Sequence, residues 1–246
     1  MFTNQLSRME GKHIASYLVR AHDVSENRKI HPPALLRIMQ DASLQHALKL
    51  GASVWDKQMK GHSWVLIKKE VKLYTYPSLN DKIRVETYPS HFDKYFAFRD
   101  WVVYDSGDNI IASAKSQWTV ININTRKMAK LPEHLYSIAL PEINLGKTNF
   151  KIVFNENPSF SKTFIVHRFD LDWNSHLNNS KLIEYMIASV PQNHFKENFT
   201  NFRIQFKSEA LLGDALDIEF YPKSDVVHLR ATNKRTEKIV ALAELD

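Results

Sequence analysis

The chain carries an internal repeat, which is the feature that most restricts its fold. When the sequence is shifted by 147 positions, Tyr17–Ala42 lies over Phe164–Ser189 without a gap, so that YLVRAHDV pairs with FIVHRFDL and LLRIM pairs with LIEYM. A second shift, of 133 positions, places Asp81–Pro89 over Asp214–Pro222. Identity is weak, but pattern and order agree over most of both halves. Because a repeat indicates one structural unit used more than once, we expect two copies of one domain, the second more compact.

Each copy is predicted to contain a strand, a helix and then several strands. His13–Val24 alternates loosely and indicates a strand. Pro32-Pro33 then opens a helix, since proline is tolerated in a first helical turn, and Gly51 is a plausible stop. Ser63–Asn124 is a succession of strands separated by turn signals. In the second copy, the predicted strands after the helix are Phe202–Phe206, Ala215–Pro222, Val226–Thr232 and Ile239–Leu245.

This order predicts the α+β class, with one helix and an antiparallel sheet in each copy. Pro141, Gly146 and Pro158 fall among scattered polar residues and indicate a connection between the copies. We therefore expect an N-terminal domain over 1–140, a linker over 141–160 and a C-terminal domain over 161–246.

Composition limits the function classes. The chain has 246 residues, no cysteine and a net charge of +6. Lack of cysteine excludes a disulfide scaffold and a thiolate nucleophile, and it fits a reducing compartment. No apolar run approaches transmembrane length, and MFTNQLSRMEGKH has no apolar core, so we expect a cytoplasmic protein without a signal peptide. Because the basic residues are dispersed and form no nucleic-acid motif, we expect neither nucleic-acid binding nor membrane insertion.

A dense polar segment precedes the predicted helix of the second copy. Asp172, Asn174 and His176 sit two residues apart, so an extended backbone would place all three side chains on one side. Asn178 and Asn179 supply capping side chains where the helix should begin. The apolar stripe of that helix is Leu182, Ile183, Met186, Ile187 and Val190. Since a helix N-terminus favours negative charge, the arrangement indicates a reaction centre.

Three other readings of this segment stand beside the reaction centre. Asp170, Asp172 and Asn174 match the first positions of a calcium loop, but Ser175 and Lys181 stand where that loop requires glycine and an acid. A zinc site has one histidine and no cysteine, so we expect no metal. A polar turn that merely caps a helix remains open.

The repeat supplies an internal control for this choice. Ser25, Asn27 and Lys29 lie opposite the polar residues at 172, 174 and 176, and Tyr76 lies opposite Glu209. The carboxylates and the imidazole therefore occur in the second copy alone. This difference suggests that one copy performs chemistry and the other supports it or binds.

The chain resembles the acyl-acyl-carrier-protein thioesterases of the plant plastid and bacterial type, over nearly its whole length. The strongest match is Asp170 to Asn179, with the pattern D-x-N-x-H-x-N-N before a helix. Further matches are Gln40-Asp41-Ala42, His46 through Leu50-Gly51, Trp64-Val65-Leu66, Tyr76-Pro77, Arg99-Asp100, Ser116-Gln117-Trp118 and Asn124-Thr125-Arg126-Lys127. The resemblance implies a double hot-dog fold and hydrolysis of fatty acyl-acyl carrier protein to free fatty acid, without a cofactor.

The resemblance also implies the catalytic residues, which are Asp172, Asn174, His176 and Glu209. Plant members usually place cysteine next to that glutamate, but here the position is Ala210, so a cysteine mechanism is impossible. The residues allow water activation by Glu209, alone or with His176. Asn174 and N–H groups at the helix start, near Asn178 and Asn179, would hold the thioester oxygen. Asp172 would orient its neighbours or serve as the base; the order of roles stays open.

The resemblance suggests an acyl tunnel in the first domain, lined by Met39, Trp64 and Trp118, although plain core packing explains each of them as well. The basic surplus would steer the acidic acyl carrier protein. An acyl-CoA thioesterase, a non-catalytic acyl-binding protein and a related dehydratase remain alternatives. Monomer and homodimer are equally open.

Overall fold

A computed structural model describes residues 11–138, 145–154, 157–195, 199–223 and 226–246. It divides into two compact units, Met1–Asn149 and Phe150–Asp246. Parts of the predicted linker, 141–160, lie outside the described residues, so its boundaries stay a prediction. Residues 1–10, which bear on the expected absence of a signal peptide, also lie outside them. Within the described ranges, no helix has the length and apolar character needed to span a membrane.

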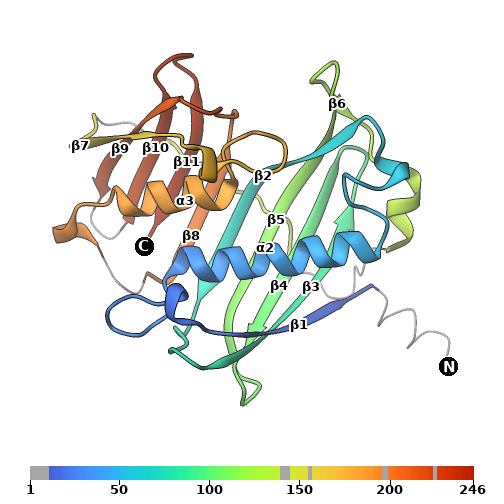
Figure 1. The fold of residues 1–246 in the computed structure, drawn as a ribbon, viewed down its shortest axis with the longest axis horizontal. Coiled ribbons are helices and arrows are strands. Elements are labelled where there is room, and N and C mark those ends of the chain that lie inside the picture. Colours follow the sequence, from blue (N-terminus) through green and yellow to red (C-terminus); the bar gives the residue numbers. More distant parts are fainter. Residues whose placement is uncertain (1–10, 139–144, 155–156, 196–198, 224–225) are drawn as a thin grey trace. The chain divides into compact units, whose positions relative to one another are not determined.

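Unit 1 pairs one long helix with an antiparallel sheet (Figure 1). The sheet order is β1-β3-β4-β5-β2, and the short β6 pairs with β5. The elements are β1 (His13–Leu18), α2 (Pro32–Lys49), β2 (His62–Leu73), β3 (Lys82–Phe92), β4 (Phe96–Tyr104), β5 (Ile110–Asn122) and β6 (Met128–Ala129), with 3-10 turns at Ala21–Asp23, Lys57–Met59 and Glu133–Ile138.

The contact between α2 and its sheet forms the core of unit 1. One apolar face of α2 is buried, and it includes Leu35, Ile38, Met39 and Ala42. Trp101 of β4 is fully buried, and its indole N–H contacts the Met39 carbonyl at 2.9 Å and Ser43 Oγ at 2.8 Å. The indole therefore fixes α2 against the sheet, since its polar atom is satisfied by the helix.

Unit 2 repeats the arrangement in a shorter form. Its sheet order is β8-β11-β10-β9-β7. The elements are β7 (Phe160–Ile165), α3 (Asn179–Ala188), β8 (Asn201–Phe206), β9 (Ala215–Lys223), β10 (Val226–Asn233) and β11 (Ile239–Leu245), with 3-10 turns at Arg168–Asp170 and Gln192–His194. The predicted α3 stripe is buried at Leu182, Ile183, Met186 and Ile187. Val190 was expected in that stripe, but it lies beyond the helix, which is closed at Ser189.

The internal repeat is confirmed at the level of individual hydrogen bonds. In unit 1, the loop before α2 is closed by Ser25 N–H donating to the Lys29 carbonyl at 2.9 Å. In unit 2, Asp172 N–H donates to the His176 carbonyl at 2.8 Å in the corresponding loop. Arg28 and Ser175, which correspond, have φ values of 62° and 61°. The two loops are therefore the same turn built from different residues.

The local backbone differs from the sequence analysis in two places. The strand predicted over His13–Val24 ends at Leu18, because Asp23 accepts the Arg20 N–H at 3.0 Å and bends the chain into a 3-10 turn. The shared side predicted for the side chains at 172, 174 and 176 depended on an extended backbone in that segment. The segment is instead a tight turn, closed by the 2.8 Å hydrogen bond described above.

Candidate active site

A tight turn in unit 2 carries three of the predicted site residues. Leu171 and Leu177 form an isolated β-bridge at its base. Ser175 N–H donates to the Asp172 carbonyl at 3.1 Å, and Ser175 adopts the left-handed backbone with φ of 61°. The turn therefore brings positions 172, 174 and 176 together by folding back.

Asp172 holds the turn through its carboxylate. One carboxylate oxygen, Oδ1, accepts the backbone N–H of Asn174 at 2.8 Å and that of His176 at 3.1 Å. A carboxylate that accepts backbone N–H groups offers the chain a local alternative to regular structure. Asp172 thus orients both neighbours through their backbone.

Asn174, His176 and Glu209 form a chain of side-chain contacts. Asn174 Nδ2 lies 3.0 Å from His176 Nδ1, and His176 Nε2 lies 3.2 Å from Glu209 Oε2. When the amide donates to Nδ1, the ring hydrogen is on Nε2 and points to the carboxylate. The His176 side chain is 19% exposed and that of Glu209 is 39% exposed, so the carboxylate end of the chain faces water.

Backbone pairing places Glu209 beside the turn. Leu177 N–H donates to the Ala210 carbonyl at 2.8 Å, and His176 forms a β-bridge with Leu211. Asp214 in turn accepts the Leu211 N–H at 2.9 Å. The segment that carries Glu209 is therefore tied to the turn that carries His176 by two main-chain contacts.

Asp214 is itself held by a polar cluster that sequence reasoning missed, in which Asp214 and Asn233 are buried and the Arg235 side chain is 59% exposed. Arg235 Nε donates to Asp214 at 2.7 Å, and Asn233 Nδ2 donates at 2.6 Å. The hydrogen bond from Arg235, above all, lowers the pKa of the Asp214 carboxyl. The two aligned stretches at 81–89 and 214–222 both begin with aspartate. This shared aspartate is the sequence signal from which the position could have been found.

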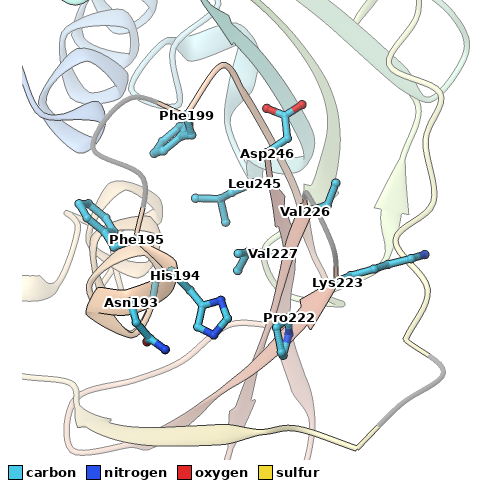
Figure 2. Close-up of a pocket in the computed structure, with 11 residues that line it drawn as sticks. Asn193, His194, Phe195, Phe199, Pro222, Lys223, Val226, Val227, Leu245 and Asp246 are labelled. Atoms are coloured by element: carbon cyan, nitrogen blue, oxygen red, sulfur yellow. The ribbon is translucent and has the colours of Figure 1, made fainter.

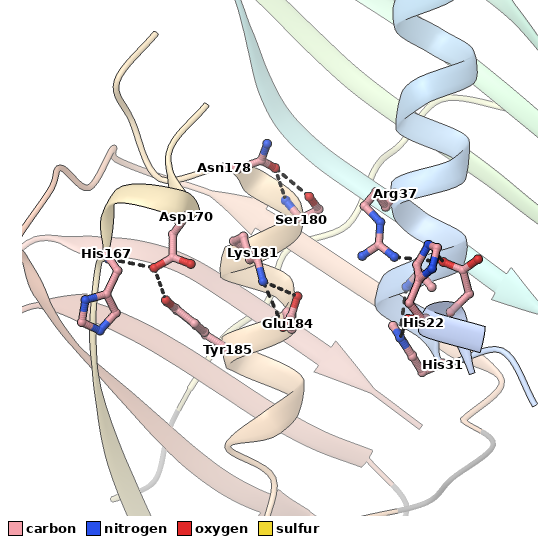
Figure 3. A network of polar contacts seen from close by, with 12 residues as sticks. His22, His31, Arg37, His167, Asp170, Asn178, Ser180, Lys181, Glu184 and Tyr185 are labelled. Atoms are coloured by element: carbon pink, nitrogen blue, oxygen red, sulfur yellow. Dashed lines mark hydrogen bonds and ion pairs between the residues drawn. The ribbon is translucent and has the colours of Figure 1, made fainter. Parts of the chain in front are cut away.

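The start of α3 is built from polar side chains (Figure 3). Asn178 Oδ1 caps the helix by accepting the Ser180 N–H at 2.9 Å. The Asn178 N–H is engaged by the Asp170 carbonyl at 2.8 Å, so it is not open to a substrate oxygen. Among the described residues, no hydrogen bond involves the N–H of Asn179, the first residue of α3. Of the two predicted helix-start residues, Asn179 is therefore the one whose N–H remains a candidate donor to a substrate oxygen.

Asp170 connects the segment before the turn to α3, and the sequence analysis did not predict this structural role. Its carboxylate accepts the His167 N–H at 2.7 Å and the Tyr185 hydroxyl at 2.5 Å (Figure 3). Burial, followed by the hydrogen bond to Asp170, raises the pKa of Tyr185. Asp23 fills the equivalent place in unit 1, where it accepts the Arg37 guanidinium at 3.1 Å. An aspartate at this point of both copies marks a structural position.

The described residues of unit 1 form no chain of contacts that corresponds to Asn174–His176–Glu209. At the position of His176 stands Lys29, whose ammonium donates to Ser78 Oγ at 2.9 Å. The helix cap there is His31, whose Nδ1 accepts the Ala34 N–H at 3.1 Å. The turn is thus kept in both units, while the imidazole and carboxylate occur in one.

The three residues predicted to line an acyl tunnel lie in unit 1 but do not form one group. Trp64 and Trp118 are half-buried and pack around the same apolar cluster, which contains Met59, Ala97, Val120 and Leu131. Met39, a residue of α2, is fully buried, and its carbonyl accepts the Trp101 N–H. The structure therefore brings the two tryptophans together and leaves Met39 in the helix–sheet core.

A pocket of about 420 Å³ lies in unit 2, beyond the C-terminal end of α3 (Figure 2). Val190, His194, Phe199 and Leu245 are among the residues that line it. None of the predicted site residues lines this pocket, and the reactive turn precedes the opposite end of α3. It is therefore separate from the Asn174–His176–Glu209 chain.

Comparisons with known proteins agree with the resemblance. The family model for the acyl-ACP thioesterase N-terminal domain matches residues 10–139, and the model for the C-terminal domain matches residues 155–242. A chloroplastic acyl-[acyl-carrier-protein] hydrolase of Cuphea viscosissima is 25% identical over 218 residues, which cover 82% of this chain and 53% of that protein. The chloroplastic oleoyl-acyl carrier protein thioesterase of Coriandrum sativum is 24% identical over 230 residues, covering 85% and 62%. The chain thus spans little more than half the length of these relatives.

Solved structures confirm the double hot-dog fold. An acyl-ACP thioesterase from Bacteroides thetaiotaomicron aligns with a TM-score of 0.85 at 20% identity, over 97% of this chain and 98% of that chain. The 12:0-ACP thioesterase from Umbellularia californica aligns with a TM-score of 0.81 at 19% identity, over 96% of each chain. At such identities the likeness concerns the fold. Together with the two family models, which cover most of the sequence in order, it leads to one conclusion: the chain belongs to the acyl-acyl-carrier-protein thioesterase family.

Proposed function

We propose that this protein hydrolyses fatty acyl-acyl carrier protein to free fatty acid and carrier protein. The observation that carries the proposal is the hydrogen-bonded chain Asn174–His176–Glu209, with contacts of 3.0 and 3.2 Å. It ends in a carboxylate that reaches solvent, and it is found in one of two otherwise equivalent turns. A binding protein has no need of such a group, whereas hydrolysis requires one to activate water.

Glu209 serves as the general base. When His176 donates its Nε2 hydrogen to Glu209, the ring cannot accept a proton from water through that atom. The carboxylate therefore takes the proton, while His176 holds the carboxylate in place and Asn174 fixes the ring tautomer. As water attacks the thioester carbonyl, Glu209 takes one of its protons; the C–S bond then breaks, and the carrier leaves as the thiol after its sulfur takes that proton from Glu209.

The developing oxyanion is held at the start of α3. Asn174 has a second amide hydrogen besides the one directed at His176, and the Asn179 N–H lies at the positive end of the helix dipole. Asp172 acts as a positioning residue, since its carboxylate oxygen Oδ1 is taken up by two backbone N–H groups. This assignment differs from one in which Asp172 is the base, and the two are separable by substitution.

The acyl group and the carrier contact other parts of the protein. We assign Trp64 and Trp118 to the acyl site because both are half-buried around one apolar cluster. The excess of 33 basic over 27 acidic residues favours an acidic carrier protein over a neutral partner. Acyl-CoA offers the same thioester with a smaller carrier, and it is the alternative substrate.

The test is thiol and fatty-acid release from acyl-carrier-protein and acyl-CoA substrates, measured on wild type, Glu209→Ala and His176→Ala. Turnover on the carrier-protein substrates, reduced at least about a hundredfold in both folded variants, is the expected result. His134→Ala, an exposed histidine of unit 1, is the matched control and should retain activity. No release from any substrate would remove the hydrolase and favour an acyl-binding protein.

A further inference from the structure

A row of small residues runs along β5 on the side of the unit 1 sheet that faces α2. Ser116, Ala114 and Ala112 are at most 2% exposed. Ala114 pairs with Trp101, whose indole contacts α2, so alternate residues of β5 share that face. Trp118 stands at one end of the row, where its N–H donates to Ser116 Oγ at 2.7 Å.

Two cationic side chains border this row. Lys69 of β2 and Arg99 of β4 both pair with Ser116, one on each side, so they point to the same face. Arg99 Nη1 lies 3.1 Å from Thr87 Oγ1 and 3.1 Å from His46 Nδ1. The interior between α2 and the sheet is therefore positively charged beside Ser116.

Lys69 is the unusual member of the pair. It is 3% exposed, and its ammonium lies 4.8 Å from the centre of the Trp101 ring. Within the part of the chain that the structure describes, no carboxylate forms an ion pair or hydrogen bond with it. Burial lowers the pKa of Lys69 to about 8. Lysine is almost never fully buried without a partner, because loss of hydration penalises its charge.

Packing alone does not account for this lysine. A methionine has nearly the same length and would fill the space without the cost of burying an ammonium. The charge therefore points to a selective role. An apolar chain laid against the ammonium would deprive it of its remaining polar surroundings and gain no hydrogen bond in return, whereas a chain that ends earlier would not reach it.

We propose that Lys69 is a specificity-determining residue that limits the acyl group to short chains by closing the row of small residues beyond Ser116. This inference rests on the proposed thioesterase function and on an acyl group that enters past Trp118. From Trp118 to Ser116 the strand advances two residues, or roughly 7 Å. The ammonium over Trp101 then stands across the continuation of the row, towards Ala114.

The test compares octanoyl and palmitoyl carrier-protein substrates on wild type, Lys69→Met and Lys72→Met. Lys72 is the matched control, because it lies on the same strand but is exposed. Wild type should prefer octanoyl. In Lys69→Met, the ratio of kcat/KM for palmitoyl over octanoyl should rise at least about tenfold, because the further methylenes of the longer chain then meet an apolar side chain of similar size in place of a buried ammonium. Lys72→Met should leave the ratio unchanged.

The outcomes separate this inference from the function on which it rests. Wild type that hydrolyses neither substrate contradicts the proposed function. Wild type that is active but prefers palmitoyl, or a folded Lys69→Met with an unaltered ratio, contradicts the role of Lys69 alone. Lys69→Leu is the second variant if methionine does not fold. Failure of both to fold, while Lys72→Met folds, would make the lysine structural and overturn the inference.

Discussion

Asp172 and Glu209 both carry a carboxylate, but the two carboxylates make different contacts, and we propose different roles for them. Asp172 uses one oxygen to accept two backbone N–H groups inside a tight turn. Glu209 contacts the imidazole of His176 and is 39% exposed. A group that shapes the backbone needs only an acceptor atom, whereas a group that takes a proton from water needs its charge. Substitution by the amide tells these two requirements apart.

Asp172→Asn should therefore retain activity within about tenfold of wild type, because the amide oxygen still accepts the two N–H groups. Asp172→Ala removes the acceptor and should lower kcat by roughly a hundredfold, since the turn loosens and His176 loses its position. Steady-state kinetics on both variants decide the matter. Equal loss in the two variants would mean that Asp172 acts through its charge.

Because of Lys69, the free energy of unfolding should change with pH in the alkaline range. Its pKa in the folded protein, about 8, is below the ordinary value of 10.5. The unfolded chain then binds more protons between these values, so the free energy of unfolding rises as pH increases through this window. The rise in unfolding free energy is at most about 3.4 kcal/mol, from 1.36 kcal/mol for each pKa unit.

Urea unfolding at pH 7 and at pH 10 measures this effect. Lys69→Met lacks the titrating group, so its stability should exceed that of wild type at pH 7, and the gap should narrow at pH 10. A gap that stays constant between the two pH values would show that the lysine is not held in an environment that disfavours its charge.

At the scale of elements, the helices and most strands follow directly from local sequence. Pro32-Pro33 and Gly51 bracket α2, and the alternating segments became the strands of both sheets. The errors occur where a single side chain redirects the backbone. Asp23 converts the end of the predicted strand into a 3-10 turn, and Asp172 folds a segment that alternation alone would leave extended. Periodicity carries no information about such local hydrogen bonds.

The site was less predictable than the elements that carry it. His176 and Glu209 are far apart in sequence, and they meet because Leu177 and Ala210 form a backbone hydrogen bond and His176 bridges to Leu211. No local pattern specifies this pairing. Glu209 could be named beforehand only through the family resemblance. Asp170 and Asp214 were missed as supports because the side-chain contacts of Asp170 with Tyr185 and of Asp214 with Arg235 follow no periodic pattern in the sequence.

The free energy of unfolding should depend strongly on Asp214, which lies immediately before β9. This carboxylate is 4% exposed and accepts hydrogen bonds from Leu211, Asn233 and Arg235. Asp214→Ala leaves the buried Asn233 amide and the Arg235 guanidinium without their acceptor, which should cost about 2–4 kcal/mol of unfolding free energy.

Asp217→Ala is the matched control for this substitution. Asp217 lies in β9, three residues after Asp214, but its ion pair with Lys234 is solvent-exposed, so its loss should cost at most about 1 kcal/mol. Urea unfolding of both variants gives the comparison. Similar costs for the two aspartates would contradict the view that Asp214 anchors the segment carrying Glu209.

At the scale of the whole molecule, the duplication shows which features of the turn occur in both units and which occur in one. Both units keep the turn before the helix, the aspartate beneath it and the same pattern of backbone hydrogen bonds. Unit 1 replaces the imidazole with Lys29, which contacts Ser78. The turn and its backbone hydrogen bonds therefore form in unit 1 without an imidazole at this position. It follows that the turn does not need the Asn174–His176–Glu209 contacts in order to fold.

Net charge belongs to the same scale and gives a kinetic prediction. With a formal charge of +6, encounter with an acidic carrier protein should be accelerated by long-range attraction and weakened by salt. The value of kcat/KM for a carrier-protein substrate should therefore fall as ionic strength increases, while kcat changes little. A salt-independent kcat/KM would indicate that charge does not guide the carrier.

The measurement that tests the central claim most directly is the turnover number of Glu209→Gln on an acyl-carrier-protein substrate. The amide preserves the size of the side chain and its contact with His176 but cannot accept a proton from water. Glu237→Gln, at an exposed glutamate of the same unit, is measured beside it. The account predicts that kcat falls at least about a hundredfold in Glu209→Gln, with KM nearly unchanged, and stays at the wild-type value in Glu237→Gln. A folded Glu209→Gln that turns over at the wild-type rate would contradict it.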